Sequence, residues 1–184
     1  RRVSENRAPS RPIVAISRCL LGEPVRYDGG DKEQPELIAA IQQQCEILPV
    51  CPEVEAGLGI PRPPVRLVKN SAQPHMAIAA IGRDDPTIDI TTPLQLFSTH
   101  FCKSAPALSG MILQNRSPSC GIDVTPYYSL TGVQQGLGDG LFTATVRNAY
   151  PTLPLASPQQ LSSPTAIAHF LAQVKRGHSR GAIV

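Results

Sequence analysis

Three of the five cysteines stand in loops rich in glycine, proline and hydroxyl residues: Cys19, Cys51 and Cys120. Each follows an apolar run of the kind that forms a buried strand. In open α/β sheets the loops at the carboxyl ends of parallel strands converge on one crevice. Three distant thiolates can therefore meet at one site. Soft sulfur ligands without an equally placed fourth indicate a metal centre with an open coordination position.

The other two cysteines, Cys45 and Cys102, lack this loop setting. Cys45 ends an apolar stripe that includes Leu37 and Ile41, and Cys102 follows Phe101 at the end of a second such stripe. Both stripes have the spacing of an amphipathic helix. We expect these two thiols to be small buried hydrophobic groups rather than ligands.

The charge is concentrated at the two ends of the chain. The net charge is +3, but the first eleven residues hold four arginines against one glutamate, and the last ten hold three basic residues and no acid. The central body, with ten basic and thirteen acidic residues, is therefore slightly acidic, which is the wrong sign for a general nucleic-acid surface. The beginning of the chain lacks the apolar core of a signal peptide, and no apolar run reaches the length of a membrane span. We expect a cytoplasmic protein.

The apolar pattern predicts alternating strands and helices. Strands are expected at residues 12–17, 46–50, 107–114 and 153–156, with a further candidate at 76–81. Helices are expected at residues 35–45 and 92–104, from a cap at Asp139 through Val146, and from Ser163-Pro164 to a stop at Gly177. The proline-rich stretch 60–75 is expected to be a surface loop or linker.

Strands and helices that alternate at this spacing indicate βαβ units. We therefore predict a single Rossmann-like α/β domain with a mostly parallel sheet and helices on both faces. The domain is expected at residues 12–174, between basic tails at 1–11 and 175–184. No glycine-rich dinucleotide fingerprint opens a helix after the first predicted strand.

The three cysteine blocks, SRCLLGEPVRYDGG, PVCPEVEAGLGIPRPP and ILQNRSPSCG, resemble the signature blocks of the TudS-type thiouracil desulfidase family. The resemblance covers roughly residues 12–161 in order. It implies a [4Fe-4S] cluster bound by Cys19, Cys51 and Cys120, with one iron free to take sulfur from a thiolated uracil. It also implies that Glu53 is the acidic catalytic residue and that Ser117 is its serine partner.

The chemistry of these residue types suits those roles. An iron with an exchangeable site can bind and polarise a thiocarbonyl. A carboxylate two residues from a ligand is well placed to deprotonate the attacking water, and a hydroxyl near Cys120 can pass a proton to the ring nitrogen. The alternatives are a surface carboxylate or helix cap for Glu53, and turn hydrogen bonding before Pro118 for Ser117.

Further residues in the same blocks are candidates for substrate binding. Tyr27 could stack on a base and Asp28 could fix a loop, although an Asp-Gly turn accounts for the same letters. The three loops each hold an arginine suited to a nucleotide phosphate: Arg26, Arg62 and Arg116. Arg26 and Arg62 could instead pair with Glu23 or Glu55. Ser119 could help to cradle an anion.

The chain also departs from the family pattern. Arg18 stands where members usually have a small residue, and Arg66 where they usually have an acid. Both changes are expected to add positive charge near the rim of the site, and they bear on substrate selection more than on the reaction.

The sequence therefore favours an iron-sulfur-dependent desulfidase that acts on thiouracil or its nucleotide. One alternative is a tRNA thiouridine desulfidase, which the acidic central body disfavours. The other is a non-catalytic zinc-binding module. Structural zinc is normally held by four ligands, often in paired C-x-x-C spacing that this chain lacks.

Overall fold

The computed structural model describes residues 10–70 and 78–180. The strands are β1 (Ile13–Ser17), β2 (Glu46–Val50), β3 (Val65–Val68), β4 (Ala79–Gly82), β5 (Gly110–Ile112), β6 (Thr125–Tyr128), β7 (Gln134–Gly138) and β8 (Leu155–Ala156). The α-helices are α1 (Pro35–Gln42), α2 (Pro52–Glu55), α3 (Thr91–Ser104), α4 (Leu141–Ala149) and α5 (Pro164–Ser179). Two short 3₁₀-helices are η1 (Arg18–Leu21) and η2 (Pro158–Leu161).

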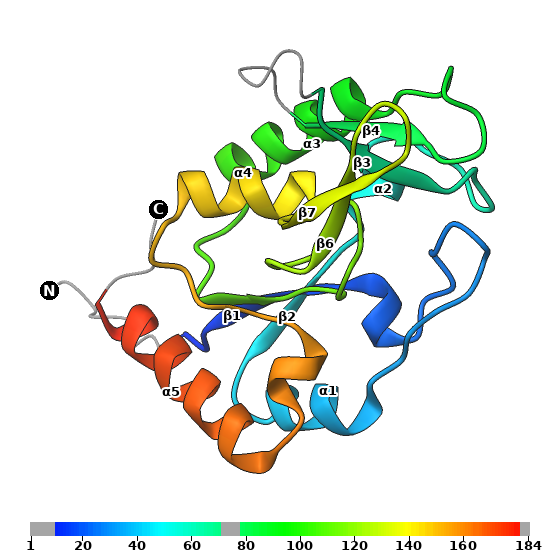
Figure 1. Cartoon of the computed structure of the whole chain (residues 1–184). Helices are drawn as coiled ribbons and strands as arrows, with labels where there is room; N and C mark the ends of the chain where they lie inside the picture. The colour runs from blue at the N-terminus through cyan, green and yellow to red at the C-terminus, as the bar shows by residue number, and fades with distance from the viewer. Residues whose placement is uncertain (1–9, 71–77, 181–184) are drawn as a thin grey trace, which may run out of the picture.

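A parallel sheet of four strands, in the order β2-β1-β5-β8, forms the centre of the fold. Helices cover both of its faces, with α1 and α5 on one side and α3 and α4 on the other (Figure 1). The sequence of β1 explains this arrangement. Val14 and Ile16 belong to the core shared with α1 and α5, whereas Ala15 between them belongs to the core shared with α3 and α4. Successive side chains of a strand point to opposite faces, so an uninterrupted apolar strand packs helices on both sides. The predicted α/β fold is confirmed.

A second sheet, in the order β4-β3-β6-β7, was not predicted. Its pairs are antiparallel except for β3 with β6. A small core that includes Leu67, Ala80 and Leu94 packs beneath it. Because Leu94 lies on α3, and Phe101 of the same helix contacts the main core, α3 connects the two sheets.

Several predicted boundaries are corrected. The stretch 60–75 is not only a loop, because β3 lies within it. The helix expected at 35–45 ends at Gln42. The strands expected at 107–114 and 153–156 are shorter, as β5 and β8. Of the candidate strand at 76–81, residues 76 and 77 lie outside the described residues, and β4 covers the remainder from Ala79.

Two predicted helix ends are also corrected. The N-cap residue of α4 is Gly140, not Asp139. The Asp139 carboxylate instead pairs with Arg147 at 2.9 Å. The helix α5 begins as predicted, with the Ser163 hydroxyl accepting a hydrogen bond from the Ala166 N–H, but it continues past Gly177 to Ser179. The segment predicted as a tail from residue 175 is therefore helical as far as Ser179.

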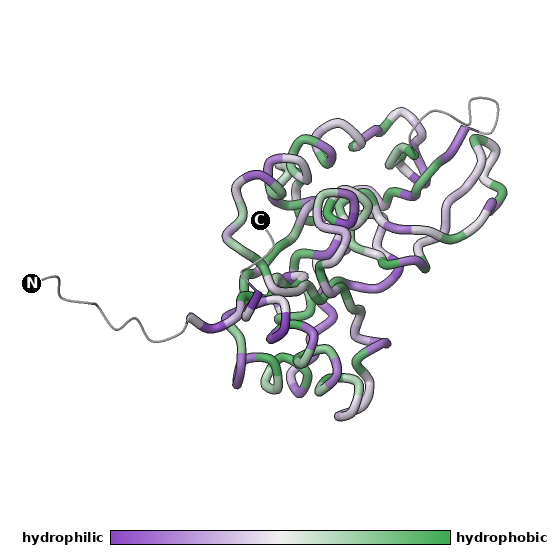
Figure 2. Tube along the Cα trace, turned by 90° about the vertical axis from the view of Figure 1, so that its left-hand side faces the viewer, coloured by the Kyte–Doolittle hydropathy of each residue, from purple (hydrophilic) through white to green (hydrophobic). Residues whose placement is uncertain are grey.

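The hydrophobic segments of the chain are short and interrupted by hydrophilic ones (Figure 2). Among the described residues, no helix is both long enough and apolar enough to cross a membrane.

Candidate metal centre

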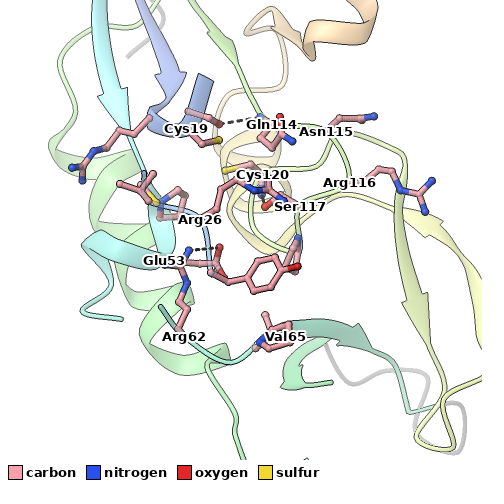
Figure 3. Close-up of a pocket in the computed structure, with 18 of the residues that line it drawn as sticks. Cys19, Arg26, Glu53, Arg62, Val65, Gln114, Asn115, Arg116, Ser117 and Cys120 are labelled. Atoms are coloured by element: carbon pink, nitrogen blue, oxygen red, sulfur yellow. Dashed lines mark hydrogen bonds and ion pairs between the residues drawn. The ribbon is translucent and has the colours of Figure 1, made fainter. Parts of the chain in front are cut away.

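The three loop cysteines face one cavity of about 240 Å³ at the carboxyl edge of the parallel sheet. Cys19 lies in η1 directly after β1, and Cys51 directly follows β2. Cys120 comes eight residues after the end of β5. The strands β2, β1 and β5 are neighbours in that order, so the convergence expected from the sequence is present in the structure. Figure 3 shows Cys19, Cys120, Glu53 and Arg62 around this cavity.

All three thiols are free and buried. Burial raises the pKa of Cys19 to about 11, although the nearby Arg26 guanidinium acts in the opposite direction. Burial also raises the pKa of Cys51 and that of Cys120. Burial therefore disfavours the thiolate form at all three positions. A bound metal would supply the positive charge that holds them as thiolates.

The remaining two cysteines lie away from this cavity. Cys45 is 2% exposed in the core beside α1, and Cys102 is half-buried against the core of α3 and α4.

The two acidic residues of α2, Glu53 and Glu55, have side chains with different surroundings. The Glu55 carboxylate accepts a hydrogen bond of 2.8 Å from the Cys51 N–H, which satisfies a donor that the start of a helix leaves unpaired. The Glu53 side chain lines the cavity instead. Its Oε2 atom lies 3.3 Å from Nη2 of Arg62, and the carboxylate side chain is only 16% exposed.

Ser117 lines the cavity and also organises the loop of the third cysteine. Its hydroxyl oxygen accepts hydrogen bonds from the N–H groups of Ser119 and Cys120, at 3.2 and 3.1 Å. Both of these bonds use the oxygen as acceptor, so the hydroxyl proton remains available for donation. The turn role anticipated for Ser117 is therefore present, and it is compatible with a chemical role.

The amino end of α4 forms backbone hydrogen bonds with the Cys120 loop. The first N–H groups of a helix have no partners within it. Here they donate hydrogen bonds of 2.8 to 3.0 Å to backbone carbonyl groups of the Cys120 loop. The Gly140 N–H donates to Gly121, the Leu141 N–H to Pro118, and the Phe142 N–H to Ser119. The buried Thr143 hydroxyl adds a 2.8 Å hydrogen bond to the Cys120 carbonyl.

Gly140 allows this close approach. A Cβ atom at position 140 would lie 2.4 Å from the carbonyl carbon and oxygen of Ser119, which are backbone atoms. We expect Gly140→Ala to displace the Cys120 loop and to destabilise the fold by about 1–3 kcal/mol, the usual cost of overpacking. Thermal unfolding and iron per chain after anaerobic loading should both decrease.

The matched control is Gly177→Ala in α5, where a Cβ atom would meet nothing within 4 Å. Alanine is the better helix former by about 0.5–1 kcal/mol, so this variant should be slightly stabilised with unchanged iron content. Wild-type stability and iron content in Gly140→Ala would contradict the account of this loop.

The charge of the cavity wall is mostly positive. Among the described residues that line it, one is acidic, Glu53, and five are arginines: Arg18, Arg26, Arg62, Arg83 and Arg116. Three of these arginines pair with carboxylates: Arg18 with Glu23, Arg62 with Glu53, and Arg83 with Asp84. Arg26 lies over the ring of Tyr27, with 6.0 Å from its guanidinium carbon to the ring centre. Arg116 is exposed and is turned away from the cysteines (Figure 3).

Two of the predicted substrate-binding residues, Asp28 and Ser119, are not among the residues that line the cavity. The Asp28 carboxylate accepts a hydrogen bond from the Gly30 N–H within an exposed turn. Ser119 is 1% exposed, and its carbonyl accepts hydrogen bonds from α4. Arg66, expected near the rim, instead lies over the ring of Tyr128 at 5.3 Å on the second sheet.

Several residues that line the cavity were not predicted from the sequence. Ser17 is the last residue of β1 and Gln114 comes two residues after the neighbouring β5. The Gln114 N–H donates a 3.0 Å hydrogen bond to the Ser17 hydroxyl. The rule that placed the cysteines, that residues after parallel strands converge, also indicates these two. Arg83 follows β4 of the second sheet, and the sequence analysis contained no signal for its position.

The chain was compared with known proteins. The family model described as 2-thiouracil desulfurase matches residues 14–157. A solved structure described as a [4Fe-4S]-dependent thiouracil desulfidase, TudS, is similar with a TM-score of 0.65 and 27% sequence identity. The similarity covers 88% of this chain and 99% of that one. Comparison with curated proteins gives no significant match.

Proposed function

The chain belongs to the 2-thiouracil desulfurase family, and from that premise we propose how its own residues perform the reaction. The enzyme is a [4Fe-4S]-dependent desulfidase that converts a thiolated uracil compound to the uracil product and sulfide. In the overall reaction, a water oxygen replaces sulfur on the ring carbon. The sulfur leaves as sulfide, and no net oxidation or reduction is needed.

The cluster would be held by Cys19, Cys51 and Cys120. The observation that carries this assignment is that three buried free thiols, from the ends of three adjacent parallel strands, surround one cavity. When bound there, a cluster with three cysteine ligands supplies a Lewis-acidic iron that accepts and polarises the thiocarbonyl sulfur.

The number of thiols favours a cluster over a structural zinc site. Three cysteines face this cavity, and a cluster with three cysteine ligands keeps one iron open. The ligands of a cluster bind different irons, so they need to surround a cavity rather than one point. Structural zinc normally has four ligands that meet at one ion, which makes the non-catalytic zinc module the weaker reading.

Glu53 would take the proton of the attacking water. Its carboxylate lines the cavity and is largely shielded from solvent, and its ion pair uses Oε2, which leaves Oε1 to accept the proton. Ser117 would donate its hydroxyl proton towards the ring nitrogen or the developing anion. The two N–H groups that bind its oxygen fix the hydroxyl in place, as pre-organised donors require.

The substrate is proposed to be a thiolated uracil base or nucleotide in the cytoplasm. Tyr27 and Val65 offer flat and apolar surface for a pyrimidine ring, and the excess of arginine favours an anionic substituent such as phosphate. Arg26 is the strongest candidate, because no carboxylate among the described residues pairs with it. A tRNA substrate is not favoured, since the central body of the chain is acidic.

The phosphate preference is tested by steady-state kinetics under anaerobic conditions. A charge-assisted hydrogen bond is worth about 1.5–3 kcal/mol, or roughly 10- to 150-fold in affinity. We therefore expect a clearly lower KM for a thiolated uridine monophosphate than for the free thiouracil. Arg26→Ala should remove this preference while sparing the free base.

Arg116→Ala is the matched comparison, and it should keep most of the preference because its side chain is turned outwards (Figure 3). Equal kcat/KM for base, nucleoside and monophosphate would exclude a phosphate subsite. Activity confined to thiolated tRNA would instead support the tRNA enzyme.

A further inference from the structure

Arg62 joins three segments of the cavity wall. Its backbone N–H donates a 2.8 Å hydrogen bond to the Tyr27 carbonyl. Its Nη1 atom donates to the Gly59 carbonyl at 3.2 Å, and its Nη2 atom lies 3.3 Å from Oε2 of Glu53. The side chain is 8% exposed. The loop after α2 therefore folds back so that this guanidinium faces the carboxylate of the same helix (Figure 3).

Within the described ranges 10–70 and 78–180, neither the Arg62 nor the Glu53 side chain forms another ion pair. Both side chains are mostly buried, so the attraction is screened less than at an exposed site. The contact is a single one, from Nη2 to Oε2, but it comes from a planar group with fixed donor directions and so limits the orientation of the carboxylate. Loss of this contact would remove the one hydrogen bond that the described residues make to the Glu53 carboxylate.

The Nε–H of Arg62 is buried and has no hydrogen-bond partner in the described part of the chain. Nε and Nη2 share one edge of the guanidinium, so this unused donor lies on the edge that faces Glu53. A side chain that served only as a loop brace would be expected to have its buried donors satisfied. The guanidinium therefore faces the Glu53 carboxylate as well as the Gly59 carbonyl of its own loop.

A phosphate role for Arg62 fits this geometry poorly. An anion bound to the same edge would lie beside the negatively charged Glu53, and like charges in a partly buried site repel each other. The position of Arg62 is better suited to acting on Glu53 itself.

We propose that Arg62 is the positioning residue for Glu53, holding the carboxylate in the orientation in which it deprotonates the attacking water. This inference rests on the proposed role of Glu53 as the base. It assigns Arg62 to the chemical step and leaves substrate affinity to other arginines of the cavity.

The first test separates turnover from affinity. A misplaced catalytic group can cost on the order of 10²-fold in rate, so Arg62→Ala should lower kcat by about 10- to 100-fold while KM for free thiouracil changes by less than about twofold. Arg62→Lys keeps the charge but loses the planar fork, so its kcat should lie between those of Arg62→Ala and the wild type. The lysine variant also provides the test if the alanine variant is unstable.

The second test is a double-mutant cycle, because residues that act through one another have non-additive effects. In the Glu53→Gln background, Arg62→Ala should lower kcat by less than about threefold further. Arg26 lines the same cavity, and within the described part of the chain it lies over the Tyr27 ring rather than against Glu53. Arg26→Ala combined with Glu53→Gln should therefore give the product of the two single effects.

Iron per chain and cluster absorbance are measured for every variant and should match the wild type, and thermal unfolding shows which variants are folded at the assay temperature. Fully multiplicative effects of Arg62→Ala and Glu53→Gln, or a raised KM with unchanged kcat, would overturn the role of Arg62 while leaving the desulfidase function intact. Wild-type turnover in Glu53→Gln would instead remove Glu53 as the base, and with it the inference about Arg62.

Discussion

Replacing Cys19, Cys51 or Cys120 singly with serine is expected to abolish both the cluster and the desulfidase activity. The three thiols line one cavity at the ends of adjacent strands, and a serine oxygen is a hard ligand that substitutes poorly for thiolate at a soft iron site. Each variant, purified anaerobically, should be colourless, with iron content and turnover near background.

The matched controls are Cys45→Ser and Cys102→Ser, which change thiols outside the cavity. Both variants should retain the brown colour and the iron content of the wild type. Full iron occupancy in a variant of Cys19, Cys51 or Cys120 would remove that residue from the ligand set. Loss of iron in the two controls would show that general destabilisation, rather than ligation, explains the result.

Glu53→Gln should leave the cluster in place and lower turnover by roughly 10²–10⁴-fold, the usual contribution of a general base. Glutamine keeps the shape of the side chain but cannot accept the proton of the attacking water. Cluster absorbance and iron per chain report on the binding site, and kcat for uracil release reports on the chemistry.

Glu55→Gln is the control for this change, because Glu55 lies two residues away and accepts a hydrogen bond from the Cys51 N–H. A glutamine carbonyl oxygen can accept the same bond, so this variant should keep both cluster and turnover. Equal turnover in Glu53→Gln and the wild type would reject Glu53 as the base.

The parallel sheet and the meeting of the three cysteines could be predicted from the sequence. Each of the strands β1, β2 and β5 is a short apolar segment between loop signals, and the periodicity of α1, α3 and α5 was clear. The carboxyl ends of neighbouring parallel strands share one edge, so three residues about 30 to 70 positions apart could be placed together before the fold was known.

The second sheet could not be predicted in the same way. β3 is four residues long and follows a proline-rich loop, and β6 contains Pro126. Pairing with distant strands, rather than local propensity, determines that these segments are extended. The helix α5 extends two residues past Gly177, to Ser179, and the Arg180 N–H still donates to the Arg176 carbonyl. A single glycine inside a helix costs only about 1 kcal/mol, so it did not end the helix.

The ion-pair partners of the arginines also could not be predicted from the sequence. Spacing left Arg62 free to pair with Glu55 or to bind phosphate, whereas in the structure Glu55 is engaged by the Cys51 N–H and Arg62 faces Glu53. The turn after α2 determines this choice, and its path depends on contacts with the loop that contains Tyr27. Side-chain direction in such loops follows from tertiary contacts rather than from residue spacing.

The most direct test of the central claim is to measure uracil and sulfide release from thiouracil by anaerobically prepared protein as a function of its iron content. Cluster-loaded protein, with about four irons per chain as the [4Fe-4S] assignment requires, should release uracil and sulfide in equal amounts. The rate should rise in proportion to the iron bound and fall to background after the iron is removed by chelation. Fully loaded protein that releases no uracil, or an unchanged rate after removal of the iron, would contradict the account.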